Sequence, residues 1–130
     1  MRKIILGLYL VLMVPLFAVA DIKLWKELFP DPCETLYLFM KDNKIFKYST
    51  RNTGGILINA EGIKEALEST KKYSMKDIAI VIHNHRFNRR FSPGDWQFYR
   101  DLKKRGFKGL FLMYCHWTKE VYDIDEKKGK

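Results

Sequence analysis

The sequence predicts a single α/β domain in which a mixed β-sheet is flanked by helices. β-prone runs alternate along the chain with stretches whose apolar residues recur at helical spacing. One run, Ile78–Ile82, is continuously apolar, which is typical of a central strand buried on both faces. The chain has 130 residues, of which 47% are hydrophobic, enough to form one core but too few for two domains.

The expected elements follow one another without a linker, a repeat or a low-complexity tract. Before the central strand we expect a helix over 21–29, stopped by Pro30, strands over 35–40 and 45–50 joined by a polar turn, a short apolar run at 56–58, and a helix over 61–72. After it we expect a helix over 93–105, with Gly106 placed to end it, and strands over 110–115 and 121–124.

Residues 1–20 have the features of a signal peptide. A short positive region, Met1–Lys3, precedes an uncharged apolar run, Ile4–Val19, and Ala18-Val19-Ala20 has the form of a cleavage site. The apolar run is shorter than the roughly 20 residues that span a bilayer comfortably. We therefore expect export, most simply to a bacterial periplasm, with a domain over 21–130. The alternative is an uncleaved membrane anchor formed by residues 4–19.

The charge balance permits an anionic partner without singling one out. The net charge of +9 becomes +7 for residues 21–130, because Arg2 and Lys3 are the only charges before them. Such a balance is compatible with nucleic acid or an anionic membrane surface. The cations are spread along the chain except at Arg86–Arg90 and Lys127–Lys130, which disfavours nucleic acid. Membrane contact is expected only if the signal segment is retained, and the oligomeric state is left open.

Two cysteines, Cys33 and Cys115, exclude a disulfide-dense scaffold and an all-cysteine zinc site within one chain. An exported domain permits a disulfide between them. The sequence leaves that pairing open.

Two histidines continue directly from the central strand. Side chains two residues apart on a strand project from the same face, so His83 and His85 point the same way. Asp95 follows at the start of a predicted helix, where its carboxylate can turn back toward the strand end. Two imidazoles, one carboxylate and a water form the kind of open site that catalytic zinc uses.

The same residues have simpler interpretations. Ser92-x-x-Asp95, with Pro93 at the first helical position, is also a capping box that requires no metal. Two histidines in a basic loop can be ordinary surface residues. The tripeptide His83-Asn84-His85 does not indicate an HNH nuclease, because those enzymes carry the three residues dispersed through a ββα-metal unit. The combination and its spacing nevertheless favour a metal.

These residues, His83-Asn84-His85 followed by Ser92-Pro93-Gly94-Asp95, resemble the H-x-H…S-x-x-D signature of the JAMM (JAB/MPN) metalloproteases. The His-Asn-His form of the motif is closest to the RadC-like bacterial branch of that family. Glu34 stands just before an early strand, where that family carries a glutamate. The resemblance covers roughly residues 34–124. It implies a JAMM/MPN-like, cytidine deaminase-like fold.

The resemblance also implies roles for individual residues. His83, His85 and Asp95 would bind one Zn²⁺, Glu34 would act as general base, and Ser92 would stabilise the oxyanion. The implied activity is that of a zinc metallopeptidase acting on a peptide or protein substrate. Arg86 replaces the usual proline after the second histidine, and six residues separate His85 from Ser92 where seven are commoner.

Two alternatives to hydrolysis stay open. One is a non-catalytic, exported binding or assembly module on the same fold, suggested by the altered loop and its cations. The other is a nucleic-acid-associated protein, suggested by the positive net charge and by the RadC-like form of the histidine motif. Arg86, Arg89 and Arg90 are candidates for selecting an acidic substrate, although a solvated loop is the default. His116 is a further candidate ligand or partner, although a turn histidine is the simpler interpretation.

Overall fold

The computed structural model describes residues 22–49 and 58–127, and it confirms the α/β class with a mixed sheet. Five strands lie in the order β2-β1-β3-β4-β5, and only the β3–β4 pair is parallel. The strands are β1 (Thr35–Met40), β2 (Ile45–Ser49), β3 (Ile78–His85), β4 (Leu110–Cys115) and β5 (Glu120–Asp123). The helices are α2 (Ile22–Leu28), α3 (Ala60–Ser69) and α4 (Pro93–Lys104), with 3₁₀ turns η2 (Met75–Asp77) and η3 (Ile124–Lys127).

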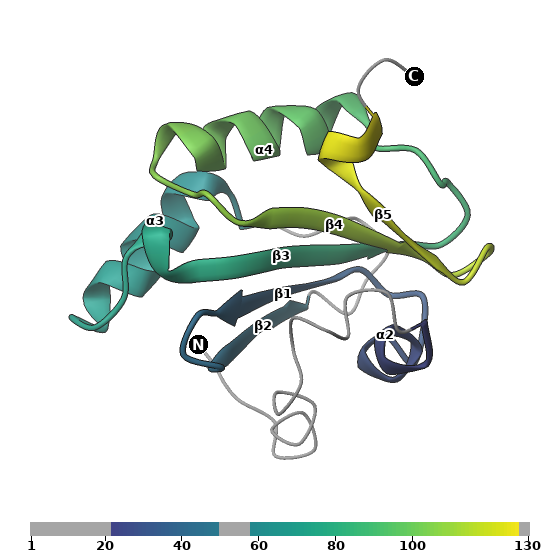
Figure 1. Cartoon of the computed structure of the whole chain (residues 1–130), viewed down its shortest axis with the longest axis horizontal. Helices are drawn as coiled ribbons and strands as arrows, with labels where there is room; N and C mark the ends of the chain where they lie inside the picture. The colour runs from purple at the N-terminus through teal and green to yellow at the C-terminus, as the bar shows by residue number, and fades with distance from the viewer. Residues whose placement is uncertain (1–21, 50–57, 128–130) are drawn as a thin grey trace.

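Helices cover both faces of the sheet (Figure 1). Helices α3 and α4 pack on one face through a cluster that includes Ile63, Leu67 and Leu102. Helix α2 packs on the other face, where Trp25 and Phe29 are buried. Strand β3 therefore has apolar residues on both sides, as its uninterrupted apolar sequence predicts.

The predicted element boundaries hold to within a few residues. The largest difference is the end of α3, which stops at Ser69 and not at residue 72. The Thr70 hydroxyl donates to the Leu67 carbonyl at 2.6 Å, and Lys71 adopts a φ of 59°, which a helix cannot continue through. The last strand spans 120–123 and not 121–124, because the fully buried Ile124 begins η3.

The close parallel pairing of β3 and β4 depends on a glycine. A Cβ built on Gly109 would lie 2.2 Å from the carbonyl oxygen of Ala79, so a side chain there would clash with the β3 backbone. Because β3 and β4 are parallel, their carboxyl ends lie at the same edge of the sheet, on the right in Figure 1. The loop between β3 and α4 and the turn between β4 and β5 meet at this edge.

Several sequence predictions lie outside the described residues. These are the signal peptide over 1–20 with its anchor alternative, and most of the apolar run 56–58. In the ranges 22–49 and 58–127, no helix is both long and apolar enough to cross a bilayer. Both cysteines are free, Cys115 in the core and Cys33 half-buried.

Candidate metal centre

The end of β3 directs its polar side chains to opposite faces of the sheet. His83 and His85 lie on the face covered by α3 and α4, and their ring centroids are 4.9 Å apart. His83 is buried and contacts the ring of Phe111, whereas His85 is half-buried at the last position of the strand. Asn84, between them, is fully buried on the α2 side. The two-residue strand period therefore places both imidazoles together, as the sequence predicts.

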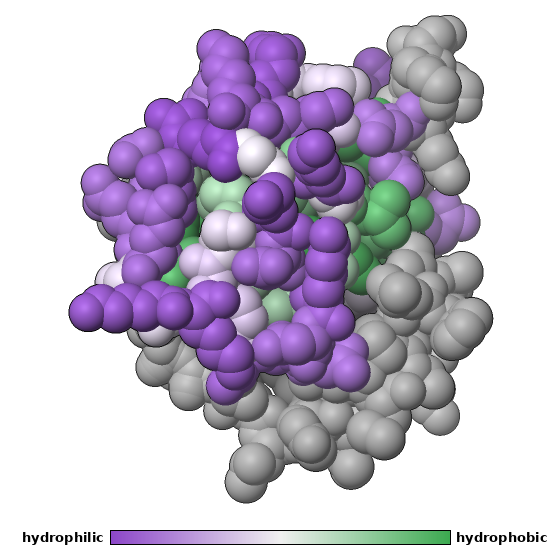
Figure 2. All heavy atoms as spheres, turned by 60° about the vertical axis from the view of Figure 1, so that its left-hand side comes forward, coloured by the Kyte–Doolittle hydropathy of each residue, from purple (hydrophilic) through white to green (hydrophobic). Residues whose placement is uncertain are grey.

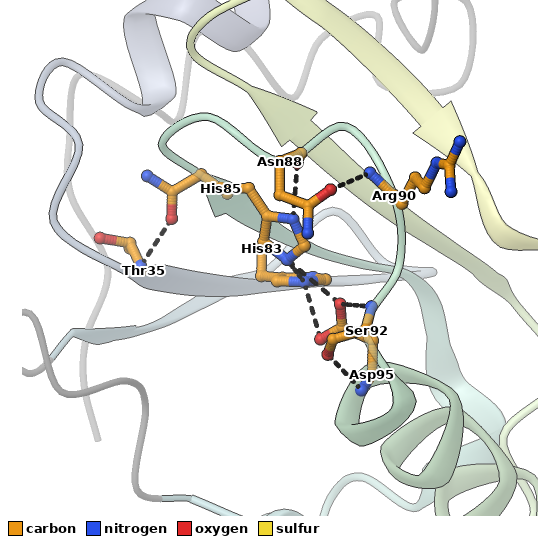
Figure 3. A network of polar contacts seen from close by, with 8 residues as sticks. Thr35, His83, His85, Asn88, Arg90, Ser92 and Asp95 are labelled. Atoms are coloured by element: carbon orange, nitrogen blue, oxygen red, sulfur yellow. Dashed lines mark hydrogen bonds and ion pairs between the residues drawn. The ribbon is translucent and has the colours of Figure 1, made fainter.

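The first turn of α4 brings Asp95 to the two imidazoles. Ser92 is the N-cap: its hydroxyl oxygen accepts the Asp95 N–H at 3.0 Å, and its own N–H donates to Asp95 Oδ2 at 2.9 Å. This capping box fixes the orientation of the Asp95 carboxylate, so that it faces the strand end (Figure 3). The cap and the metal interpretation of Asp95 are thus compatible with each other.

Three side chains converge with their ligand atoms close enough together to share one metal ion. His83 Nε2 lies 3.2 Å from Asp95 Oδ1 and 3.2 Å from His85 Nε2, and His85 Nε2 lies 3.1 Å from Asp95 Oδ2. Ligands at the usual zinc distances in a tetrahedral site stand about 3.3 Å from one another. The His83–His85–Asp95 group can therefore hold a metal ion with little rearrangement.

The protons available in this group do not satisfy all of its acceptors. His85 Nδ1 lies 2.8 Å from the Asn88 carbonyl, which can only accept, so Nδ1 carries a proton and Nε2 of the neutral ring presents a lone pair. His83 Nδ1 is buried and, within the described ranges, has no hydrogen-bond partner. A neutral His83 can carry its proton on Nε2 and donate it to Asp95 Oδ1, but His85 Nε2 and Asp95 Oδ2 then face each other as two acceptors at 3.1 Å. A further proton or a metal ion would turn that contact into an attractive one.

The pKa values of His85 and Asp95 are shifted in the directions that a shared proton between them predicts. Burial lowers the pKa of His85, but the hydrogen bonds to Asp95 and to the Asn88 carbonyl raise it more, and Glu34 adds to the rise. Burial raises the pKa of Asp95, but the contacts with His83 and His85 and the Ser92 N–H lower it far below its usual range. In the metal-free chain the Asp95 carboxylate therefore stays ionised to unusually low pH, and His85 keeps its second proton to a higher pH than an ordinary histidine does.

Glu34 and the metal group share one cavity. Its volume is about 370 Å³, and its lining includes Glu34, His83 and Asp95 with the apolar side chains of Leu36 and Phe98. Leu36 is paired with His83 across the antiparallel β1–β3 ladder, which brings Glu34 to the level of His85. A carboxylate beside a candidate metal site in a partly apolar cavity is placed to exchange protons with a bound water.

Asn84 forms a second polar cluster, on the α2 face. Its Oδ1 accepts the Thr35 N–H at 2.8 Å, and its Nδ2 donates to the Cys33 carbonyl at 3.1 Å. The same amide lies 2.8 Å from His116 Nε2, so the imidazole accepts from it. These bonds attach the residues on either side of Glu34 to β3. Asn84 therefore fixes the backbone from which Glu34 projects.

The structure brings together most of the site residues that the sequence predicts, but His116 lies apart from them. His83, His85, Asp95 and Glu34 lie in one place, and Ser92 lies beside them as the helix cap. His116 does not join this group, because it lies on the other face with Asn84, against the ring of Phe29. The contacts of Asn84 and of the Asn88 carbonyl were not predicted from the sequence. The only signal for Asn84 was a polar residue inside a buried strand.

Comparisons with known proteins add no assignment. No protein-family model matches the chain, and no curated protein matches its sequence. The case for a metal at this candidate site therefore rests on its residues and geometry alone.

Proposed function

We propose that this protein is an exported, zinc-dependent hydrolase that cleaves a peptide or isopeptide bond. The observation that carries the proposal is the convergence of two imidazoles and one carboxylate at zinc-ligand spacing, with a further carboxylate in the same cavity. The resemblance of this constellation to the JAMM signature supports zinc over other metals and an amide over other bonds. Mixed nitrogen and oxygen ligands with an open position are also typical of catalytic zinc.

The ligands would be His83, His85 and Asp95. Zinc in such a site lowers the pKa of a water to about 7 and polarises a substrate carbonyl. The His85 ring is held for this role by its bond to the Asn88 carbonyl, and the Asp95 carboxylate is held by the capping box. Both ligands are thus oriented by contacts that the metal-free fold already makes.

The proton transfers belong to Glu34 and the oxyanion contact to Ser92. In the proposed reaction Glu34 takes a proton from the attacking water and later delivers it to the leaving amine. The Ser92 oxygen already accepts the Asp95 N–H, which leaves the hydroxyl proton available to donate to a developing oxyanion. One proton of the water would reach the leaving amine through Glu34, and the other would pass from the new carboxyl group to solvent, so that the products would be a neutral amine, a carboxylate and a proton.

Glu34→Gln tests the proposal with little change in shape. The purified protein would be loaded with zinc and assayed against a library of internally quenched peptides and a fluorogenic lysine-isopeptide probe. We expect full zinc content and a rate lowered by about 10²- to 10⁴-fold, the usual contribution of a general base. Glu27→Gln is the matched control, because Glu27 is exposed on α2 outside the cavity.

Two results would contradict the proposal. Equal loss of rate in both variants would show that the activity does not depend on Glu34. A zinc-loaded parent that cleaves none of the peptide or isopeptide probes would instead favour a non-catalytic binding module on this fold.

A further inference from the structure

The two most exposed large hydrophobic side chains of the described ranges occupy adjoining loops beside the metal centre. Phe87 is 65% exposed and Trp117 is 67% exposed. The Trp117 N–H donates to the Arg86 carbonyl at 3.1 Å, and the His116 N–H donates to the His85 carbonyl at 2.9 Å. The loop after β3 and the turn after β4 are therefore fastened together at the residues that carry the exposed rings. Exposed apolar groups gathered in this way usually mark a binding surface.

Cations accompany these two rings. Arg86, Arg89 and Lys119 are all exposed, and residues 86–91 and 116–119 include no acidic side chain. The ion pairs of the described ranges involve none of these three cations. The Arg86 guanidinium carbon lies 5.8 Å from the centre of the Phe87 ring. We call Arg86, Phe87, Arg89, Trp117 and Lys119 the aromatic–cationic surface.

The charges of this surface act over the same small region. Burial lowers the pKa of His116, and although Asp31 raises it, Lys119 and Arg86 both lower it further. Lys119, on the turn after β4, and Arg86, on the loop after β3, therefore both lie near the same imidazole. Arg90 is not part of this surface, because its side chain extends away from His83, His85 and Asp95 (Figure 3).

The surface adjoins the proposed site through a metal ligand. Arg86 directly follows His85, and the Asn88 carbonyl accepts the His85 Nδ1 proton at 2.8 Å. The cavity that holds Glu34 borders His83 and Asp95, whereas the aromatic–cationic surface borders His85. The cavity and the surface therefore adjoin different ligands of the same candidate metal centre, so a chain bound there can contact both.

The opposite end of the sheet has a different character. Figure 2 brings the left side of Figure 1 forward, the end that carries α3, and most of the side chains drawn there are hydrophilic. Among the described residues, the exposed large rings of Phe87 and Trp117 are thus found at the metal-centre edge.

We propose that the aromatic–cationic surface binds an acidic, partly apolar segment of the polypeptide substrate, and that it thereby selects the substrate of the metal site. The proposal rests on the proposed function for its location and on charge complementarity for its ligand. Trp and Arg are the residues that most often dominate binding energy, and arginines beside aromatic rings suit carboxylates flanked by apolar groups. A polypeptide is favoured over a nucleic acid because the surface adjoins a site proposed to cleave amides.

Binding can be measured separately from metal and catalysis. The probe is a fluorescein-labelled peptide of alternating Asp and Leu, and its control replaces every Asp with Asn. Fluorescence anisotropy would follow both peptides, and a single-stranded oligonucleotide of equal length, on the zinc-free protein and on the zinc-loaded protein. We expect the acidic peptide to bind with an affinity that falls as salt is added, and the Asn peptide to bind at least about ten-fold more weakly.

Paired variants locate the binding site. We expect the Arg86→Gln/Arg89→Gln and Phe87→Ser/Trp117→Ser doubles each to weaken the acidic peptide about ten-fold or more. The matched control is Lys104→Gln/Lys108→Gln, which removes the same charge at the opposite end of the sheet and should leave binding as in the parent. All four side chains of the test doubles are exposed, so the fold should persist, which circular dichroism would check.

Every outcome decides the proposal. Equal binding of the two peptides, or equal weakening by the control double, would overturn it. Tighter binding of the oligonucleotide, lost in the same two doubles, would overturn it in favour of a nucleic acid. Selective peptide binding by a protein that neither holds zinc nor cleaves amides would leave the docking surface standing while the proposed function fails.

Discussion

The polar side chains at the end of β3 are hydrogen-bonded differently on the two faces of the sheet. On the α2 face, Asn84 has a partner for its acceptor and for its donors, and those partners lie at the start of β1, just before it and on the turn after β4. On the α3–α4 face, the neighbouring His83 and His85 direct their Nε2 atoms at each other and at Asp95. His83 also keeps a buried nitrogen that the described residues leave without a partner.

The difference separates a fully hydrogen-bonded polar cluster from one that can take up a cation. Buried polar groups are normally hydrogen-bonded, and the Asn84 cluster follows this rule without help. In the His83–His85–Asp95 group, His85 Nε2 and Asp95 Oδ2 meet as two acceptors unless a proton or a metal ion lies between them, and His83 Nδ1 has no partner within the described ranges. Sites that depart from the rules of folding in this way are where function is expected. The contrast can be tested by disturbing each face in turn.

Asn84→Ala should have the largest effect on stability. It leaves the Thr35 N–H, the Cys33 carbonyl and the His116 imidazole without their partner in a buried environment. We expect the free energy of unfolding to fall by about 2–4 kcal/mol, since each unsatisfied buried group costs about 1–3 kcal/mol and some will find water. Urea denaturation of the zinc-free protein measures this loss.

Asn88→Ala is the control for that loss. Asn88 is exposed, and its side chain accepts only the Arg90 N–H among the described residues. We expect about 0.5 kcal/mol or less, as for most surface substitutions. If Asn84→Ala were as mild as Asn88→Ala, the α2-face cluster would not hold the strand end as described.

His83→Phe should change stability much less than Asn84→Ala does. The imidazole contacts the rings of Phe91 and Phe111, so a phenyl ring suits the surroundings and removes the unpartnered Nδ1. The loss of the His83 Nε2–Asp95 Oδ1 contact opposes that gain, so we expect the free energy of unfolding of the zinc-free protein to stay within about 1 kcal/mol of the parent. The same variant should lose zinc. A marked loss of stability in the absence of zinc would mean that His83 has a structural role and would weaken the contrast between the faces.

The two faces should also differ in how their histidines titrate. In the zinc-free protein the pKa of His85 lies above the ordinary 6.5, while burial and nearby cations hold that of His116 below it. His85 therefore contributes stability that is complete below pH 6.5 and is lost as pH rises through its folded pKa. His116 contributes stability that is complete above pH 6.5 and is lost as pH falls toward its folded pKa.

Imidazole proton resonances followed by NMR across pH 4–9 would give both values directly. Zinc should abolish the titration of His85 and leave that of His116 in place. Titration of the two histidines with the same midpoint would contradict the assignment of opposite environments.

Local patterns were sufficient to predict part of this arrangement. The two-residue period of a strand placed His83 and His85 on one face, and Ser92-x-x-Asp95 predicted the helix cap. The helix ends were less accurate, because the hydroxyl of Thr70 ends α3 through a contact that propensity does not report. The fold class needed only the alternation of apolar patterns.

The remaining features depend on contacts that are distant in sequence. Asn84 meets Thr35 across 49 positions and His116 across 32, and neither pairing leaves a local mark. Glu34 was named from a resemblance and not from its own surroundings. Only the β1–β3 register, with Leu36 beside His83, explains how it reaches the cavity. The aromatic–cationic surface likewise requires two loops that are joined only in the folded chain.

The central claim is tested most directly by the zinc content of the protein, purified without chelator and measured by elemental analysis in the parent and three variants. Asp95→Asn removes the charge of the ligand but keeps an oxygen for the cap. Ser92→Ala removes the cap hydroxyl, and Asp101→Asn changes another carboxylate on α4.

We predict about one zinc per chain in the parent, in Ser92→Ala and in Asp101→Asn, with Ser92→Ala losing about 1 kcal/mol of stability. Asp95→Asn should retain far less. A parent that is folded, carries no zinc and takes up none when it is added would contradict the account, and Ser92 and Asp95 would then be a helix cap alone.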